Sequence, residues 1–400
     1  MRYQSYLNTA GLIIESYKGT EPLSSFLKKF FAADKKYGSK DRKQIAALCY
    51  HYFRLGKAVQ HIPVNERIIL ATFLCESSNN DFLKFHRPEW NDKITASIKE
   101  KLSIINAPFS IDDIFPWKDE LSEGIGYLQL SMSFLQQPLL FLRIRPGKKD
   151  IVVKQLQAVG IRFELIGDDC IALPNATKLD GIVEIDKDVV VQDLNSQRVL
   201  DYLKTKVGNS QIAVRKEPEV LSSNPASAWD CCAASGGKSI LACDILQGNL
   251  KLMVSDIRKN SLINLEKRFS TAGIKNYDSF ITDLTTANSQ LPVTNCKLII
   301  CDAPCTGSGT WSRTPEQLFY FDSRTINVFA DLQKKIVSKA TPALAEGGLF
   351  FYITCSVFEA ENEKITEFIK KKFHLQLLQV ESLTGYDKNA DSMYVAVFTR

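Results

Sequence analysis

Two cysteines in this sequence stand at the ends of apolar, strand-like runs. Cys355 follows the run in "LFFYITCSVFEAENE", and Cys305 follows the run in "LIICDAPCTGSGT". A cysteine that only fills a hydrophobic core is expected within a strand, as Cys301 is, whereas these two lie where the chain turns, beside Pro304 and Ser356. A thiol at such a turn can act as a nucleophile or a base. The positions therefore favour a chemical role over a packing role for both cysteines.

A glycine-containing loop, "DCCAASGGKS", connects another apolar run to a helical pattern. It is not a Walker A loop, because that pattern requires glycine at the position of Cys232, and it lacks the Gly-x-Gly-x-x-Gly dinucleotide fingerprint. Gly236 and Gly237 would still let the backbone approach a ligand closely at the start of the helix. Two glycines alone could also form a plain tight turn.

Aspartates end the next three strand-like runs, at Asp256, Asp283 and Asp302. A carboxylate at the position of Asp256 can bind both hydroxyls of a ribose, and Asp283 could contact an adenine or neighbouring backbone. Either of these two aspartates alone could simply cap the helix that follows it. Both together, at successive strand ends after a glycine loop, favour an adenosine-containing cofactor.

Strand-like and helix-like segments alternate from Ser227 onward, which predicts a mostly parallel, doubly wound sheet. The last two strand-like segments, "LQLLQVESL" and "MYVAVFTR", have no helix between them, so they should pair antiparallel. Ligands of such sheets bind beyond the carboxyl ends of the strands. The pattern places at those ends Cys232, Asp256, Asp283, Asp302 and Cys355.

The rest of the chain divides into two further parts. Residues 1–125 carry helix-period patterns such as "DRKQIAALCYHYFRLGKAV" and are predicted to form a helical domain. Residues 126–210 are predicted to form a small α+β part, with a strand in "LLFLRIR", a glycine-ended helix in "IVVKQLQAVG" and a hairpin in "IRFELIGDDCIALP". A polar linker, "RKEPEVLSSNPAS", precedes the sheet, which belongs to a third domain over residues 211–400.

The composition is that of an ordinary globular protein, since 45% of the 400 residues are hydrophobic and 24% are charged. Ten cysteines without a Cys-x-x-Cys pair, and four scattered histidines, indicate neither a disulfide framework nor a zinc site. No run is long and apolar enough for a membrane helix, and the N-terminus resembles an amphipathic helix rather than a signal peptide. These observations predict a cytoplasmic protein with no metal.

The net charge of +5 is mild, but basic residues cluster in two stretches. Residues 28–43 interleave basic side chains with aromatic ones, and a second stretch contributes Arg143, Arg145, Lys148, Lys149 and Lys154. Each stretch alone is best explained as a solvated helix face. Together they favour a phosphate-rich partner, a nucleic acid.

Three stretches, "DCCAASGGKS", "DAPCTGSGT" and "YITCSVFEAENE", in this order and spacing, resemble the RNA cytosine-C5 methyltransferases of the Sun/Fmu (RsmB-like) and NSUN group. The resemblance covers the whole predicted sheet domain and extends upstream to "VVVQDLNSQ". It reaches weakly to "SKDRKQIAALCYHYFRLG", which looks like the NusB-like helical domain of the Sun/Fmu branch. The expected fold is thus an α/β, Rossmann-like class I methyltransferase domain, preceded by an all-helical NusB-like domain and a small α+β segment.

The resemblance also implies roles for individual residues. Cys355 would be the nucleophile, and Cys305 would be the second cysteine, which helps to release the product. S-adenosylmethionine would be surrounded by Cys232, Ala233, Ala234, Ser235, Gly236, Gly237, Lys238, Asp256, Asp283 and Asp302. Asp302 would also face the target base.

Several positions depart from the family pattern. The proline of the glycine loop is Ser235 here, and the arginine usual five residues after the ribose-binding acid is Ser261, for which Arg258 could substitute. The usual "LRVN" reads "LRIR" at residues 142–145, and the closing "DGFF"-like motif reads "DSMY" at residues 391–394. None of these changes removes a catalytic group.

The chemistry explains why two thiols are needed. C5 of cytosine is too weak a nucleophile to take a methyl group from a sulfonium, and a thiolate that adds to C6 raises the electron density at C5. The site must therefore lower the pKa of Cys355 or remove its proton during attack. Asp302 can hydrogen-bond the N3/N4 edge of cytosine and, if protonated, supply a proton to N3. After methyl transfer the C5 proton must leave, and Cys305 is the natural base.

These residues predict an S-adenosylmethionine-dependent RNA cytosine-C5 methyltransferase, a monomer acting on small-subunit ribosomal RNA. The target cytosine should be single-stranded, looped or flipped out, because a base inside a helix cannot reach such a site. One alternative is a tRNA cytosine-C5 methyltransferase, and another is a non-catalytic RNA-binding ribosome-assembly factor on the same scaffold. Glu361 and Glu363 are predicted to cap or flank the helix after Cys355 rather than to act in catalysis.

Overall fold

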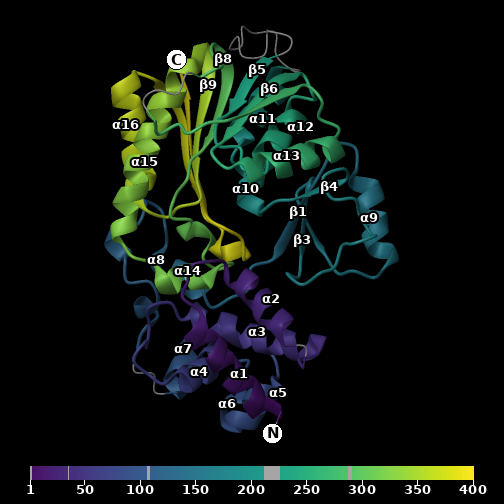
Figure 1. Ribbon diagram of the computed structural model, residues 1–400, viewed down its shortest axis with the longest axis vertical. Helices are drawn as coiled ribbons and strands as arrows, with labels where there is room; N and C mark the ends of the chain where they lie inside the picture. The colour runs from purple at the N-terminus through teal and green to yellow at the C-terminus, as the bar shows by residue number, and fades with distance from the viewer. Residues whose placement is uncertain (1, 35, 106–108, 211–225, 287–290) are drawn as a thin grey trace. The chain divides into compact units, whose positions relative to one another are not determined.

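The structure is a computed structural model that describes residues 2–34, 36–105, 109–210, 226–286 and 291–400 (Figure 1). Most of the predicted polar linker lies outside these ranges. The chain forms two compact units, of which the first comprises residues 1–121, 126–137 and 310–323, and the second comprises residues 122–125, 138–309 and 324–400. The division into three domains at residues 125 and 210 stays a prediction, and each unit is described below by itself.

The first unit is helical. Its elements are α1 (Arg2–Ser16), α2 (Leu23–Ala33), α3 (Ser39–Arg54), α4 (Val64–Cys75), α5 (Asp81–His86), α6 (Pro88–Asn91), α7 (Ile98–Ile104), η1 (Ile111–Ile114), η2 (Lys118–Glu120), α8 (Tyr127–Ser133) and α14 (Pro315–Tyr320). In α3 the buried Ile45, Leu48, Cys49, Tyr52 and Phe53 recur at the helical period of about 3.6 residues, so one face of this helix packs into the core. The predicted helical pattern is confirmed here, whereas the NusB-like resemblance stays a prediction.

A segment from much later in the chain completes the helical unit. In α14 the ring of Phe319 lies 5.6 Å from the ring of Tyr52 and 5.3 Å from that of Phe53. The buried guanidinium of Arg54 donates to the carbonyl of Ser312, at 3.0 Å. Local sequence patterns assign residues 310–323 to the sheet domain, and only these long-range contacts reveal that they belong to the helical unit.

The second unit contains a small antiparallel sheet, in the order β2 (Glu164–Ile166), β3 (Cys170–Leu173), β1 (Leu140–Ile144) and β4 (Val189–Val191). Helix α9 (Lys149–Ala158) packs on it through Val152 and Leu156, which are buried in one cluster with Leu142 and Ile144. The predicted strand, helix and hairpin are confirmed. Strand β4 was not predicted from the sequence.

The larger sheet has seven strands, in the order β10, β11, β9, β8, β5, β6 and β7. Their bounds are β5 (Ala226–Asp230), β6 (Leu250–Asp256), β7 (Tyr277–Ile281), β8 (Cys296–Asp302), β9 (Leu344–Thr354), β10 (Gln376–Leu383) and β11 (Met393–Thr399). The five strands from β5 to β9 pair parallel, and β11 pairs antiparallel with both β9 and β10. The predicted α/β class and the antiparallel end of the sheet are both confirmed.

Helices cover both faces of this sheet (Figure 1). One layer contains α10 (Leu194–Arg198), α11 (Asp201–Ser210), α12 (Gly237–Ile245) and α13 (Lys259–Ala272), and the other contains α15 (Arg324–Ala340) and α16 (Glu363–Phe373). Short helical turns are η4 (Ser308–Thr310), η5 (Thr341–Ala343), η6 (Glu359–Glu361) and η7 (Tyr386–Lys388). Because both faces are covered, the central strands consist largely of buried apolar residues, and Phe351 of β9 is fully buried.

The parallel register brings the ends of these strands to one edge. Asp256, the last residue of β6, pairs with Ile281 at the end of β7, and Asp302 at the end of β8 pairs with Ile353 near the end of β9. Side chains that follow these positions must therefore gather at the same edge, as the sequence predicted.

Candidate active site

A cavity of about 490 Å³ opens at the carboxyl edge of the seven-stranded sheet, within the second unit. Of the residues singled out in the sequence, those that line it are Cys232, Ala234, Asp256, Arg258, Asp283, Asp302, Cys305 and Cys355. Five others, namely Ala233, Ser235, Gly236, Gly237 and Lys238, are not among the lining residues. The structure thus brings both cysteines and all three strand-end aspartates to one cavity. Most of the glycine loop does not line this cavity.

The glycine loop takes its shape from packing against α13. Gly236 has φ of +82°, and a Cβ there would lie 2.7 Å from the ring of Phe269 and 3.0 Å from Leu265. Ala234 also has positive φ, of 46°, which is uncommon for a residue with a Cβ. Its N–H donates to Oδ2 of Asp256 at 3.0 Å. The close packing against α13 therefore requires glycine at position 236. The hydrogen bond from Ala234 connects this loop to the end of β6.

Asp256 is buried and fully engaged by protein groups. Besides Ala234, it accepts hydrogen bonds from the Arg258 backbone N–H at 2.8 Å and from Arg258 Nε at 3.1 Å. The Arg258 side chain itself is 65% exposed. Because an exposed guanidinium can move into solvent at little cost, its contact with Asp256 can be exchanged for a ligand contact.

Asp283 follows β7 and is partly exposed. Its Oδ1 accepts hydrogen bonds from Thr285, from the backbone N–H at 2.8 Å and from Oγ1 at 2.6 Å, and these bonds lower the pKa of Asp283. The apolar side chains of Ile257 and Leu284 line the cavity near the two aspartates, and Ile257 is 60% exposed. This end of the cavity combines carboxylates with an uncovered apolar surface.

Lys238, near the start of α12, donates from Nζ to Oδ2 of Asp302 at 2.7 Å. Burial works against a charged Lys238, but Asp302, and to a smaller extent Cys355, outweigh it and raise the pKa of this lysine. The ammonium group is therefore held charged beside both Asp302 and Cys355 at neutral pH.

Cys355, which follows β9, and Cys305, which follows β8, face each other. The Sγ atoms of Cys305 and Cys355 are 3.4 Å apart, and both side chains are free thiols of intermediate exposure. The hydrogen bond with Cys355, followed by burial and by the nearby Glu361, raises the pKa of Cys305 well above its ordinary value. One small molecule in the cavity could touch both sulfur atoms.

A network of hydroxyl groups and one carboxylate lies directly behind the cysteines. Glu361 accepts hydrogen bonds from the Thr306 backbone N–H at 2.8 Å, from Thr306 Oγ1 at 2.6 Å and from Ser356 Oγ. Ser308 Oγ lies 3.2 Å from Ser356 Oγ and accepts the N–H of Val357 at 2.9 Å. The sequence prediction for Glu361 considered only the following helix, and it missed this network because partners fifty residues apart leave no local pattern.

Gly309 fastens the Cys305 loop to the Cys355 turn. Its N–H donates to the carbonyl of Cys355, and its carbonyl accepts the N–H of Ser392, both at 2.9 Å. A Cβ at this position would lie 2.1 Å from the Ser392 carbonyl oxygen, so no other residue fits. The glycine belongs to the quoted motif "DAPCTGSGT", but its role was not predicted.

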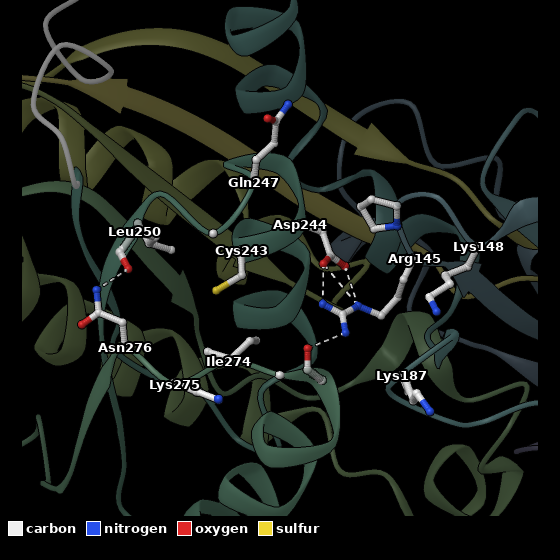
Figure 2. Close-up of a pocket in the computed structure, with 14 residues that line it drawn as sticks. Arg145, Lys148, Lys187, Cys243, Asp244, Gln247, Leu250, Ile274, Lys275 and Asn276 are labelled. Atoms are coloured by element: carbon white, nitrogen blue, oxygen red, sulfur yellow. Dashed lines mark hydrogen bonds and ion pairs between the residues drawn. The ribbon is translucent and has the colours of Figure 1, made fainter.

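A second cavity, of about 520 Å³, lies at the other end of α12 (Figure 2). There Asp244 accepts from Arg143 Nη1 at 2.6 Å and from Arg145 Nη2 at 2.7 Å, and Arg145 also donates to the carbonyl of Ala272 at 2.7 Å. These bonds hold β1 to the ends of α12 and α13. Arg143 and Arg145, predicted as part of a basic cluster for nucleic acid, are instead committed to internal ion pairs.

The described residues contain no group of three or more His, Cys, Asp or Glu side chains arranged to hold a metal ion. Among the described helices, none has the length and apolar character that crossing a bilayer requires.

The strand order, the antiparallel final strand and the helices on both faces define a class I methyltransferase fold. Residues 220–398 match the sequence model of a family described as 16S rRNA methyltransferase RsmB/F. This part of the chain is therefore similar to the RsmB/F methyltransferase family, in agreement with the resemblance of the motifs.

Curated relatives match part of the chain. Ribosomal RNA small subunit methyltransferase F of Psychromonas ingrahamii is 29% identical over 156 residues, which is 38% of this chain and 32% of that protein. Ribosomal RNA small subunit methyltransferase B of an Enterobacter species is 28% identical over 189 residues, which is 46% of this chain and 39% of that protein. The chain thus spans well under half the length of either relative.

Solved structures share the fold. The protein PH0851 superposes with a TM-score of 0.70 at 16% identity, over 100% of this chain and 98% of that one. NSun6 from Pyrococcus horikoshii, solved with SFG, gives a TM-score of 0.52 at 15% identity, over 66% of this chain and 91% of that one. At such identities the likeness concerns the fold alone.

Proposed function

We propose that this chain is an S-adenosylmethionine-dependent RNA cytosine-C5 methyltransferase that modifies small-subunit ribosomal RNA. The observation that carries the proposal is the 3.4 Å separation between the Sγ atoms of Cys305 and Cys355, in a cavity also lined by Asp256 and Asp302. Adjacent thiols can first attach to a pyrimidine ring and then help to release it. The family description and the names of the relatives support ribosomal RNA as the substrate.

The aspartate end of the cavity fits an adenosine cofactor. Asp256 can exchange its contact with the exposed Arg258 for two ribose hydroxyls, as a carboxylate at a strand end does in nucleotide-binding sheets. Ile257 and Leu284 offer an apolar surface to an adenine ring, and Asp283 offers an acceptor beside them. When bound, S-adenosylmethionine supplies an electrophilic methyl group.

Cys355 is the proposed nucleophile, and its thiolate would add to C6 of the cytosine. The ammonium group of Lys238 places a positive charge beside the attacking sulfur. Asp302, held by Lys238 at 2.7 Å, would accept a hydrogen bond from the N4 amino group. A proton delivered to N3 as negative charge develops would come from this lysine–aspartate pair.

Cys305 is the proposed base for product release. While Cys355 is a free thiol, its contact contributes most to the raised pKa of Cys305. Once the Cys355 sulfur is bonded to C6, it can no longer hydrogen-bond Cys305 as a thiol or carry charge, so that cause is removed. Cys305 can then take the C5 proton, after which the bond between Cys355 and C6 breaks and the methylated base leaves.

The proposal is tested with purified protein, small-subunit ribosomal RNA and S-adenosylmethionine labelled in its methyl group. Label should appear in 5-methylcytidine after digestion of the RNA, and bisulfite mapping of cellular RNA with and without the gene should locate the site. Labelled tRNA with unlabelled ribosomal RNA would favour the tRNA alternative. A protein that binds RNA but shows no heat of S-adenosylmethionine binding by titration calorimetry would favour the non-catalytic one.

A further inference from the structure

Glu361 is a buried carboxylate that joins the loops of the two cysteines. Its side chain is inaccessible to solvent, and it follows Cys355 by only six residues in the chain. It accepts two hydrogen bonds from Thr306, the residue after Cys305, and one from Ser356, the residue after Cys355. Gln333 Nε2, from α15, donates to it at 3.3 Å. The carboxylate therefore fixes both cysteine loops from behind.

This arrangement is not that of a helix cap. Helix α16 begins at Glu363, and its N-cap residue is Asn362, so Glu361 flanks this helix and does not cap it. Four donors around two oxygen atoms match an ionised carboxylate, which is an acceptor only. Burial raises the pKa of Glu361, and the hydrogen bonds from Ser356, Thr306 and Gln333 oppose that shift.

The charges around the two sulfur atoms are of opposite sign. Lys238, which is held beside Asp302, acts on Cys355, whereas Glu361 acts on Cys305. The other titratable group at Glu361 is Tyr352, whose hydroxyl donates to the Glu361 carbonyl and whose pKa is raised by burial. The negative charge of Glu361 disfavours the thiolate of Cys305, whereas the positive charge of Lys238 lies on the other side, beside Cys355.

We propose that Glu361 is a positioning residue that determines which of the two cysteines attacks, by holding both loops together and keeping its charge on the side of Cys305. The inference rests on the proposed function, because only an enzyme that uses one of two adjacent thiols needs such a choice. Removing the charge of Glu361 should make Cys305 easier to ionise. Cys305 would then compete with Cys355 for the base.

The first experiment measures thiol reactivity in the free protein, where no substrate is needed. Wild type, Glu361→Gln and Glu361→Asp are treated with limiting iodoacetamide between pH 7 and 9, and peptide mass spectrometry follows Cys305 and Cys355 separately. Wild type should react first at Cys355. In Glu361→Gln the rate at Cys305 should rise about tenfold for each unit by which its pKa falls, whereas Glu361→Asp, which keeps the charge, should stay near wild type.

Glu363→Gln is the matched control, because this carboxylate is two residues away and bonds Ser122 rather than the cysteine loops. It should leave the ratio of the two alkylation rates unchanged. Circular dichroism melting checks that each variant is folded. An unchanged ratio in folded Glu361→Gln, or an equal change in Glu363→Gln, would overturn the role of Glu361.

The second experiment uses RNA that contains 5-fluorocytidine, which cannot lose its C5 substituent and so traps the covalent adduct. Wild type should be linked through Cys355 alone, and Glu361→Gln through both cysteines, with kcat for normal RNA at least tenfold lower and KM for RNA within twofold of wild type. A wild type that neither methylates RNA nor forms the adduct overturns the proposed function. An active wild type with Glu361→Gln still linked only through Cys355 overturns the role of Glu361 alone.

Discussion

The two ends of α12 each carry a cluster of ion pairs, and the clusters differ in what surrounds them. At the first end, Lys238 makes one contact with Asp302, whose side chain is 29% exposed and lines the cavity with the cysteines. At the other end, Asp244 is bound by both Arg143 and Arg145 and is only 7% exposed. Figure 2 shows its contact with Arg145. Both clusters pair an aspartate with a basic side chain, and they differ in how far the aspartate is exposed and in how many basic partners it has.

The largest effect is expected at the cysteines beside the first cluster. Cys355→Ala should lower methyl transfer by about 10⁴-fold or more, because it removes the thiol that is proposed to form the bond to C6. Cys305→Ala should instead accumulate a covalent protein–RNA adduct, visible on a denaturing gel. Cys296→Ala, at a buried cysteine within β8, is the control and should keep methyl transfer per folded molecule. An adduct that required Cys305 and formed without Cys355 would reverse the two roles.

Breaking the second cluster should affect stability and leave the chemistry intact. Asp244→Ala leaves Arg143 and Arg145 buried without their counter-charge, which should cost about 3–5 kcal/mol in the free energy of unfolding measured in urea. The activity per folded molecule should remain that of wild type. Asp168→Ala removes the exposed partner of Lys149 and should change stability by less than about 0.5 kcal/mol. A loss of activity in folded Asp244→Ala would refute the distinction between the clusters.

Asp302→Asn is expected to lower activity strongly and stability only slightly, which is the opposite of the pattern expected for Asp244→Ala. An amide cannot hold Lys238 by charge or accept from the cytosine as a carboxylate does, so kcat should fall by about 10²–10³-fold. The free energy of unfolding should fall by only about 1 kcal/mol, since the pair is partly exposed. Steady-state kinetics and urea unfolding of the same preparations check both numbers. A variant that loses stability but keeps kcat would make this pair structural, like the one at Asp244.

A buried acid behind the first cluster should give stability a distinct pH dependence. Burial raises the pKa of Asp230 to about 7, with Asp302 adding to the shift and a hydrogen bond from Ser239 opposing it. The folded protein keeps this proton up to about pH 7, whereas the unfolded chain loses it near pH 4. The folded state thus binds more protons between these values, so the free energy of unfolding falls as pH rises from about 4 to 7.

Asp230→Asn should flatten that slope, by about 1 kcal/mol per pH unit at most, in urea titrations at pH 5, 6 and 7. Asp283→Asn is the control, because the pKa of this exposed acid is lowered rather than raised. Equal slopes in Asp230→Asn and wild type would show that Asp230 is ionised in the folded protein.

The smallest effect is expected at the rim of the second cavity. Lys275→Ala should change the free energy of unfolding by less than about 0.5 kcal/mol and should leave kcat unaltered, because the bonds that fasten this region are made by Arg145. Filter binding of RNA at two salt concentrations checks its affinity. A salt-dependent loss of RNA affinity would mean that this end of α12 also contacts the substrate.

The features of the site that could be predicted from sequence were those that depend on the order of neighbouring segments, such as a polar residue directly after an apolar strand. Parallel strands with polar side chains directly after them must bring those side chains to one edge, so Asp256, Asp302 and Cys355 could be assigned to one site. The pairing of β11 followed from the missing crossover helix. The roles of Glu361 and Gly309 could not be predicted, because their partners are brought close only by the folded sheet.

The prediction that Arg143 and Arg145 serve a nucleic-acid surface was wrong for a related reason. Arg143 and Arg145 alternate with apolar residues on β1, and a charge count cannot tell that Asp244, about a hundred positions later, neutralises both. Strand β4 was missed because a run of three valines fits several conformations, and its register comes from its pairing with β1. Sequence patterns show the composition and the period of a segment. Ion pairs between residues far apart in the chain determine which charged side chains remain free to bind a partner.

The assignment of residues 310–323 to the helical unit has a practical consequence for dissecting the protein. A fragment cut out as residues 138–400 would contain the whole seven-stranded sheet, but it would also carry α14 without α3, on which Phe319 packs. Helix α14 would then expose aromatic side chains to water, and the fragment would be prone to aggregate. The chain cannot be divided into these two units at a single peptide bond. A fragment with the seven-stranded sheet needs residues 310–323 replaced by a short polar loop, or residues 2–137 supplied as a separate chain.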